Sequence, residues 1–223
     1  APEERIEAVM ARVTVFGGTG YAGAHLVREA VARGHEVRAV TRRAPEAPVP
    51  GAEYVEGDAR DAVSVREAVA GADVVLASLS PRGDMAGRLV EAVGVVADAA
   101  REAGARLGVV GGAGSLRTEP GGPLVVDTPG VVDEYKPESR EMGYLLDALR
   151  ADDTGLDWFF VSPAIGFGSH APGERTGAYR VGGDTPVYDA QSTSYISGED
   201  LAVAFLDEVE KPAHHRERFT VGY

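Results

Sequence analysis

A glycine-rich segment near the amino end carries the strongest chemical signal in the sequence. Residues 17–23 read Gly-Gly-Thr-Gly-Tyr-Ala-Gly, between a short β-rich run (12–17) and a helical pattern (20–33). Glycines at such a turn leave main-chain N–H groups bare at the positive end of a helix dipole, an arrangement that binds phosphate. The alternative is a glycine turn needed only for packing. We expect a dinucleotide diphosphate to contact Gly17, Thr19, Gly20, Tyr21, Ala22 and Gly23.

Two arginines follow the second predicted strand. Arg42 and Arg43 come directly after the alternating run 35–41, and the first carboxylate beyond them is Glu46. An acidic residue at this place would bind the ribose 2′-hydroxyl of NAD, whereas guanidinium groups suit the 2′-phosphate of NADP. We therefore expect NADP(H) to be preferred, with NAD(H) as the second option. The alternative is that one or both arginines are solvated surface charges.

Small and polar residues follow the next strands, at the carboxyl ends where ligands bind in open α/β sheets. Asp58, in the segment Glu-Gly-Asp-Ala-Arg-Asp, could accept a hydrogen bond from the adenine amine. It could equally cap the helix that starts near Asp61. The other cofactor contacts that we expect at these strand ends are Ser78, Leu79, Ser80, Gly111 and Gly112.

The elements that position these residues alternate between strands and helices. Short apolar or alternating runs predict strands over 12–17, 35–41, 53–56, 73–79, 106–112, 156–163 and 218–223. Helical spacing predicts helices over 20–33, 61–70, 84–103, 137–151 and 197–210. Ser197 and Asp200 form a capping-box pattern at the start of the last helix. The alternation predicts an α/β fold, a doubly wound parallel sheet of the NAD(P)-binding Rossmann type.

The chain is predicted to form one domain with a small C-terminal cap. Met10 begins a natural-looking start, so we interpret residues 1–9 as an extension and 10–223 as a single Rossmann domain. Residues 166–195 are rich in glycine and aromatic residues and are expected to form the cap and substrate region. His170 and Arg175 in this region are candidate substrate contacts, although Arg175 could instead pair with a local carboxylate.

Composition excludes several classes of function. Lys+Arg is 22 and Asp+Glu is 35, giving a formal charge of -13, which argues against nucleic-acid partners and anionic membranes. The absence of cysteine excludes disulfides, a thiolate nucleophile and cysteine-bound metals, and we expect no metal site. No apolar stretch approaches the ~20 residues of a membrane span. We expect a cytoplasmic protein with a small-molecule electron acceptor, as a monomer or a homodimer.

The sequence resembles a known family over residues 11–223. The motifs VTVFGGTGYAG, VEGDARD, GVVGGAGSL, LDWFFVSPA, PGERTG and RFTVGY are similar to those of atypical short-chain dehydrogenase/reductases described as NAD(P)H-flavin reductases. These proteins are relatives of biliverdin IXβ/flavin reductase and of NAD(P)-binding sensor proteins. The resemblance implies a doubly wound NAD(P)-binding fold. It also implies that the nicotinamide lies beside Pro163 and Ala164.

The sequence departs from that superfamily in its catalytic motif. Typical short-chain dehydrogenases use Tyr-x-x-x-Lys, in which the lysine lowers the tyrosine pKa so that the tyrosine can protonate a carbonyl oxygen. None of the eight tyrosines here is followed by lysine four residues later. Tyr135 and Lys136 are adjacent, and adjacent residues on a helix do not face each other. The candidate catalytic residues are Ser115, which follows the fifth strand, together with Tyr135 and Lys136.

The missing pair favours an acceptor that needs no protein acid. In flavin reduction the cofactors carry the chemistry, and the proton can come from solvent. We expect an NADP(H)-dependent oxidoreductase that transfers hydride to a flavin (FMN, FAD or riboflavin), a quinone or a related conjugated acceptor. The alternative is a non-catalytic NAD(P)-binding redox sensor. A sugar-nucleotide epimerase or dehydratase is a weaker option, because the C-terminal portion is small for such a substrate.

Overall fold

The computed structural model describes residues 10–223, so the predicted extension over 1–9 lies outside the described residues. The strands are β1 (Arg12–Phe16), β2 (Glu36–Thr41), β3 (Ala52–Glu56), β4 (Val74–Ala77), β5 (Arg106–Val110), β6 (Trp158–Ser162), β7 (Arg180–Gly182) and β8 (Glu217–Gly222). They form one eight-stranded sheet in the order β3-β2-β1-β4-β5-β6-β8-β7. The sheet pairs in parallel from β3 to β8, and β7 lies antiparallel to β8 at the edge.

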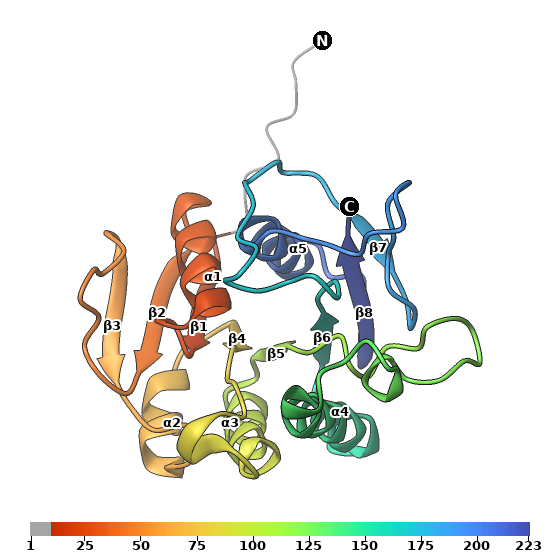
Figure 1. Ribbon diagram of the computed structural model, residues 1–223. Coiled ribbons are helices and arrows are strands. Elements are labelled where there is room, and N and C mark those ends of the chain that lie inside the picture. Colours follow the sequence, from red (N-terminus) through yellow and green to blue (C-terminus); the bar gives the residue numbers. More distant parts are fainter. Residues whose placement is uncertain (1–9) are drawn as a thin grey trace.

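Helices cover both faces of the sheet. They are α1 (Tyr21–Ala32), α2 (Ala62–Val69), α3 (Leu89–Ala103), α4 (Lys136–Ala151) and α5 (Gly198–Glu210). Figure 1 shows α1 and α5 on one face and α2, α3 and α4 on the other. This arrangement confirms the predicted doubly wound α/β fold.

The two layers of helices enclose two apolar cores. Adjacent strand residues point to opposite faces, so Phe160 packs into the core under α3 and α4 while Phe159 packs into the core under α5. Both rings are fully buried, as is every residue of β4. Central parallel strands are covered on both faces, which explains why the sequence shows them as continuous apolar runs.

The segment between β4 and α3 differs from the sequence prediction. The predicted helix over 84–103 begins only at Leu89, and a short 3₁₀ turn, Gly83–Met85, precedes it. Gly83 and Gly87 adopt positive φ values of 60° and 74°, which a continuous right-handed helix does not admit. The apolar spacing over 84–103 gave no indication of this interruption. As a result, residues 80–88 form a connection that borders the strand ends instead of a first helical turn.

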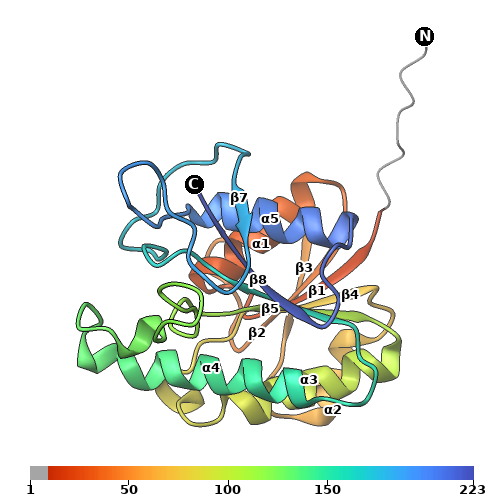
Figure 2. The same ribbon diagram turned by 90° about the vertical axis from the view of Figure 1, so that its right-hand side faces the viewer.

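The connections that follow the parallel strands gather at one edge of the sheet. Figure 2 shows the segment after β5 and the segment after β6 on the same side of the molecule as the start of α1. Of the predicted cap, 166–195, only Arg180–Gly182 is a strand, and it pairs with the end of β8.

Asp200 ties this region to the body of the protein. Ser197 is the N-cap of α5 and accepts a hydrogen bond from the N–H of Asp200, as the capping-box pattern predicted. The Asp200 carboxylate does not return to the Ser197 N–H, which donates instead to the Tyr223 hydroxyl at 3.3 Å. The carboxylate accepts hydrogen bonds from the N–H groups of Thr176 and Gly177, at 3.0 and 2.8 Å, and from the Thr176 hydroxyl. One buried side chain therefore joins α5 to the Pro-Gly-Glu-Arg-Thr-Gly segment.

Asp200 is fully buried and ionised. Burial by itself would raise the pKa of its carboxyl, but the hydrogen bonds from Thr176, Tyr223 and Gly177 outweigh burial and hold the pKa below its ordinary value. Because the pKa is lower in the folded than in the unfolded chain, the stabilisation is complete above the ordinary pKa. It disappears as the pH falls through the lowered pKa.

We expect Asp200→Asn to lower the free energy of unfolding by roughly 1–3 kcal/mol at neutral pH, because an amide cannot accept all of these hydrogen bonds. Urea unfolding followed by circular dichroism measures the change. Between about pH 5 and pH 3 the wild-type protein should lose stability more steeply than the variant. Glu199→Gln, one residue away in the same helical turn, is the matched control and should leave the acid dependence nearly unchanged. Parallel pH curves for wild type and Asp200→Asn would contradict this account.

Candidate functional site

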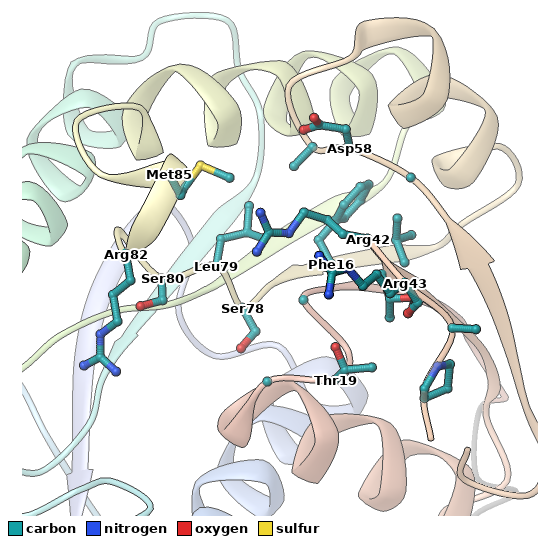
Figure 3. Close-up of a pocket in the computed structure, with 18 of the residues that line it drawn as sticks. Phe16, Thr19, Arg42, Arg43, Asp58, Ser78, Leu79, Ser80, Arg82 and Met85 are labelled. Carbon is teal, nitrogen blue, oxygen red and sulfur yellow. The ribbon is translucent and has the colours of Figure 1, made fainter. Parts of the chain in front are cut away.

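A cleft of about 760 Å³ opens where β1, β2, β3 and β4 end. Figure 3 shows Thr19 on the side of α1, Arg42 and Arg43 after β2, and Asp58 and Met85 on the opposite side of the cleft. The predicted cofactor residues that line this cleft are Gly17, Thr19, Gly20, Arg42, Arg43, Asp58, Ser78, Leu79 and Ser80. The predicted contacts outside its lining are Tyr21, Ala22, Gly23, Gly111, Gly112, Pro163 and Ala164.

Three of the glycines at the β1–α1 turn are required by the protein itself. Gly17 has φ +76°, and a Cβ there would lie 2.0 Å from the carbonyl oxygen of Ser78. A Cβ on Gly23 would lie 2.0 Å from the Gly17 carbonyl oxygen, and one on Gly18 would lie 2.8 Å from the Cβ of Ala39. Packing within the protein, the alternative explanation of the glycine turn, therefore accounts for the glycines at positions 17, 18 and 23.

Gly20 is different. Its φ is −69°, which any residue adopts, and the nearest atom to a Cβ there is the Gly17 carbonyl oxygen at 3.4 Å, an ordinary contact. The fold would accept a side chain at this position, which lines the cleft at the N-cap of α1. A side chain at position 20 would extend into the cleft and occupy space that a bound ligand would need. Gly20 therefore fits a ligand that approaches the main chain closely.

The first turn of α1 suits an anion. Within the part of the chain that the structure describes, no side chain caps this helix, and its first turn contains no acidic residue. By contrast, α5 has Ser197 as its cap and Glu199 and Asp200 in its first turn. The positive end of the α1 dipole is thus not neutralised by the protein, and a diphosphate fits there.

Arginines form the outer wall of the cleft. Arg42 is exposed, and its Nη1 lies 2.6 Å from Oδ1 of Asp84, while Arg43 is exposed beside it. Arg82 is the third arginine that lines the cleft. Arg60, just before α2, lies outside the lining, with its guanidinium group 2.8 Å from Asp58 and 3.3 Å from Asp84. Neither Arg60 nor Asp84 was predicted from the sequence, although each lies in a segment that follows a strand.

Asp58 is held by its neighbour Arg60. Its carboxylate accepts hydrogen bonds from the Arg60 side chain and, at 2.9 Å, from the Arg60 N–H, and these bonds lower the pKa of Asp58 to about 2. The helix cap is Asp61, which accepts from the N–H of Val63. Asp58 is therefore not the cap of α2. Its contact with adenine stays a prediction.

A buried arginine organises the ends of β5 and β6. Arg218 in β8 donates from Nη1 to the hydroxyls of Ser115 and Ser162, at 3.2 and 3.1 Å, and its Nε donates to Asp184 at 2.9 Å. Because the Ser115 oxygen accepts from a cation, the hydroxyl proton of Ser115 is available for donation elsewhere. Nothing in the sequence pattern indicated that Arg218, in the last strand, would reach Ser115.

The face of α4 turned toward Ser115 contains no proton-donating pair. A Cβ on Gly114 would lie 2.8 Å from the Cβ of Ser139, and a Cβ on Gly143 would lie 3.6 Å from the Cβ of Ser115. Ser139 and Gly143 are four residues apart, so they occupy one helix face with the spacing of the Tyr-x-x-x-Lys motif. Neither is a tyrosine or a lysine.

Tyr135 and Lys136 lie where α4 begins. Tyr135 is 54% exposed, and the Lys136 ammonium pairs with Asp133 at 2.5 Å beside a second hollow, between α3 and α4. Among residues 10–223, no hydrogen bond joins Ser115 to either side chain. The catalytic roles of Ser115, Tyr135 and Lys136 stay predictions, and only Ser115 lies at the end of a central strand.

The two candidate substrate residues of the cap differ in their surroundings. Arg175 forms an ion pair with the buried Glu29 of α1 at 2.9 Å, as in the local-pairing alternative, while His170 is exposed. Substrate contact by either residue stays a prediction. In the described residues, no group of three or more His, Asp or Glu side chains is placed to hold a metal ion. None of the helices from Met10 onward has the length and apolar character to cross a membrane.

A family model described as NAD(P)H-binding matches residues 17–212. The chain belongs to this NAD(P)H-binding family. The match includes the glycine turn, Arg42, Asp58 and the strand ends that line the cleft. It confirms the predicted NAD(P)-binding Rossmann fold.

Solved structures support the assignment over nearly the whole chain. A candidate exported protein from Burkholderia pseudomallei is 37% identical with a TM-score of 0.84, covering 96% of this chain and 100% of that one. A candidate epimerase from Bacteroides thetaiotaomicron is 34% identical with a TM-score of 0.86, covering 96% and 97%. A candidate NADH-flavin reductase from Streptococcus pneumoniae is 30% identical with a TM-score of 0.83, covering 95% and 99%. The present chain, a member of the NAD(P)H-binding family, thus has an oxidoreductase-like fold and a small-molecule partner.

The two kinds of glycine at the turn can be separated by mutation. We expect Gly20→Ala to keep the free energy of unfolding within about 0.5 kcal/mol of wild type, but to weaken NADPH binding by roughly tenfold or more, about 1.4 kcal/mol. Gly23→Ala should destabilise the protein by roughly 1–3 kcal/mol, because its methyl group meets backbone that cannot move freely. Urea unfolding and titration calorimetry measure the two effects. Wild-type NADPH affinity in Gly20→Ala would show that the diphosphate does not bind at this turn.

Proposed function

We propose that this protein is an NADP(H)-dependent oxidoreductase that passes a hydride to a flavin, a quinone or a related conjugated acceptor. The face of α4 opposite Ser115 carries the proposal. Ser139 and Gly143 occupy this face at the four-residue spacing of a tyrosine–lysine pair, and neither of them is a tyrosine or a lysine. Ketone reduction needs a protein acid at that place, whereas a conjugated ring can take its proton from solvent.

The cleft wall supports NADP(H) as the preferred cofactor. Arg42 and Arg43 follow β2, at the strand end that meets the adenosine ribose in this fold, and both line the cleft. Guanidinium groups bind a phosphate dianion through charge and paired hydrogen bonds. Glu46 also lines the cleft but lies several residues beyond the end of the strand.

The protein's own residues hold and orient the two ring systems. The reduced nicotinamide supplies the hydride, and the acceptor takes it up together with one proton from solvent. The first turn of α1 binds the diphosphate, and the segment after β6 offers apolar surface for a planar ring. The side chain that offers this surface is Ile165, which is 44% exposed, whereas Ala164, the residue before it, is buried and offers none. An apolar floor excludes water from one side of the reacting rings.

A non-catalytic sensor that binds NAD(P)(H) is the second candidate. The same face of α4 favours it, because a protein without an acid beside the nicotinamide can bind the cofactor without consuming it.

The cytoplasmic location and the oligomeric state also stay predictions.

The 2′-phosphate assignment predicts a selective loss on mutation. Arg42→Ala should weaken NADPH binding by roughly 1–3 kcal/mol, the scale of a lost charge-assisted hydrogen bond, and leave NADH binding nearly unchanged. Titration calorimetry with both cofactors measures this difference. Arg101→Ala, an exposed arginine on α3, is the matched control for loss of one positive charge. Equal NADPH affinity in wild type and Arg42→Ala would refute the assignment.

The acceptor class predicts which compounds oxidise NADPH. In stopped-flow measurements of nicotinamide absorbance, FMN, FAD, riboflavin or a quinone should support turnover, and simple ketones and aldehydes should not. Turnover of a ketone would contradict the proposal, because the sequence contains no Tyr-x-x-x-Lys motif to protonate it. Tight NADPH binding without oxidation by any acceptor would favour the sensor.

A further inference from the structure

A carboxylate bridges Arg42, which lines the cleft, and Arg60, which lies outside the lining. Asp84 lies in the 3₁₀ turn between β4 and α3, Arg42 follows β2, and Arg60 precedes α2. One Asp84 oxygen lies 2.6 Å from Nη1 of Arg42, and the other lies 3.3 Å from Nη2 of Arg60. Three segments that are distant in sequence thus meet at one acidic side chain.

The Asp84 carboxylate interacts with the two guanidinium groups in the way that a bound phosphate would. A phosphate dianion presents several oxygens, each able to accept from a different guanidinium group, and a carboxylate does the same with two. Arg42 is also the group that we assign to the 2′-phosphate of NADP(H). Both anions therefore require the guanidinium group of Arg42.

We propose that Asp84 competes with the 2′-phosphate of NADP(H) for the guanidinium group of Arg42, and so sets how strongly the protein distinguishes NADP(H) from NAD(H). This inference rests on the proposed NADP(H) function. The competition applies only to a cofactor that bears the 2′-phosphate, since NAD(H) has a neutral hydroxyl in its place.

The competing charge is present at neutral pH. The hydrogen bond from Arg42 is the main cause that holds the pKa of the Asp84 carboxyl below its ordinary value. The side chains of Arg42 and Asp84 are 65% and 52% exposed, so salt and water weaken their attraction. A phosphate dianion can therefore displace Asp84 at a modest cost in affinity.

The segment that contains Asp84 is anchored without it. Arg82 pairs with Glu138 at 2.8 Å, the N–H of Gly87 donates to Glu141 at 2.8 Å, and the Met85 side chain is buried in the core. Loss of the Asp84 carboxylate thus leaves the turn attached to α4 and to the core. This permits a variant that changes the competition without unfolding the site.

The test compares Asp84→Asn with wild type by titration calorimetry at low salt. The probes are NADPH, NADH and two half-cofactors, 2′,5′-ADP and 5′-AMP, which differ only in the 2′-phosphate. We expect NADPH and 2′,5′-ADP to bind about two- to five-fold more tightly to the variant, the scale of an exposed ion pair. NADH and 5′-AMP should bind equally to both proteins and so confirm that the variant is folded. Asp98→Asn, an exposed and ion-paired aspartate on α3, controls for overall charge.

Two further measurements identify the mechanism. The gain in Asp84→Asn should shrink as ionic strength rises, because the competing pair is exposed. It should also shrink in the Arg42→Ala background, where Asp84 has lost its closest partner. Unchanged NADPH affinity in Asp84→Asn, or an equal gain for NADH, would overturn the inference while leaving the proposed function in place. Failure of the wild-type protein to bind either cofactor would overturn both.

Discussion

The close approach of main chain to main chain at the β1–α1 turn is the constraint on which the site depends. The carbonyl of Ser78, after β4, and the carbonyl of Gly17, after β1, each lie where a Cβ at Gly17 or Gly23 would need to be. The turn can therefore pack against the end of β4 only without side chains at these positions. That packing fixes where α1 begins, and with it the place where an anion meets the helix dipole. Gly20 has no side chain, so its main chain is accessible within a turn whose geometry the other glycines determine.

Local charge, not net charge, decides what the cleft can bind. The chain carries a formal charge of -13, yet guanidinium groups dominate the outer wall of the cleft. Distant surface charges are screened over about 10 Å at ordinary ionic strength, so the nearby arginines determine the field that a phosphate meets. Asp58 and Asp84 moderate this field by pairing with Arg60 and Arg42. Neighbouring carboxylates thus pair with two of the arginines in and beside the cleft.

Two buried charged side chains, Asp200 and Arg218, join irregular segments of the chain to its helices and strands. Asp200 fastens the segment around Thr176 to α5, and Arg218 joins the ends of β5 and β6 through Ser115 and Ser162. Both are charged and buried, so each must keep its hydrogen bonds to remain stable. They hold irregular connections of the chain in fixed positions.

The sequence by itself determined the alternation of strands and helices apart from the short antiparallel strand β7, the parallel pairing of the other strands and the NAD(P)H-binding family. These follow from short-range patterns: apolar periodicity, glycine spacing and the residues directly after each strand. The contacts of the dinucleotide at the carboxyl edge of the sheet stay predictions. Only the tertiary structure decided that Gly20 alone among the turn glycines is free of packing demands. The same holds for the pairing of Arg42 with Asp84, of Arg175 with Glu29 and of Arg218 with Ser115. Each of these pairs joins residues more than forty positions apart, and a one-dimensional pattern contains no information on which distant side chains the crossovers of the sheet bring together.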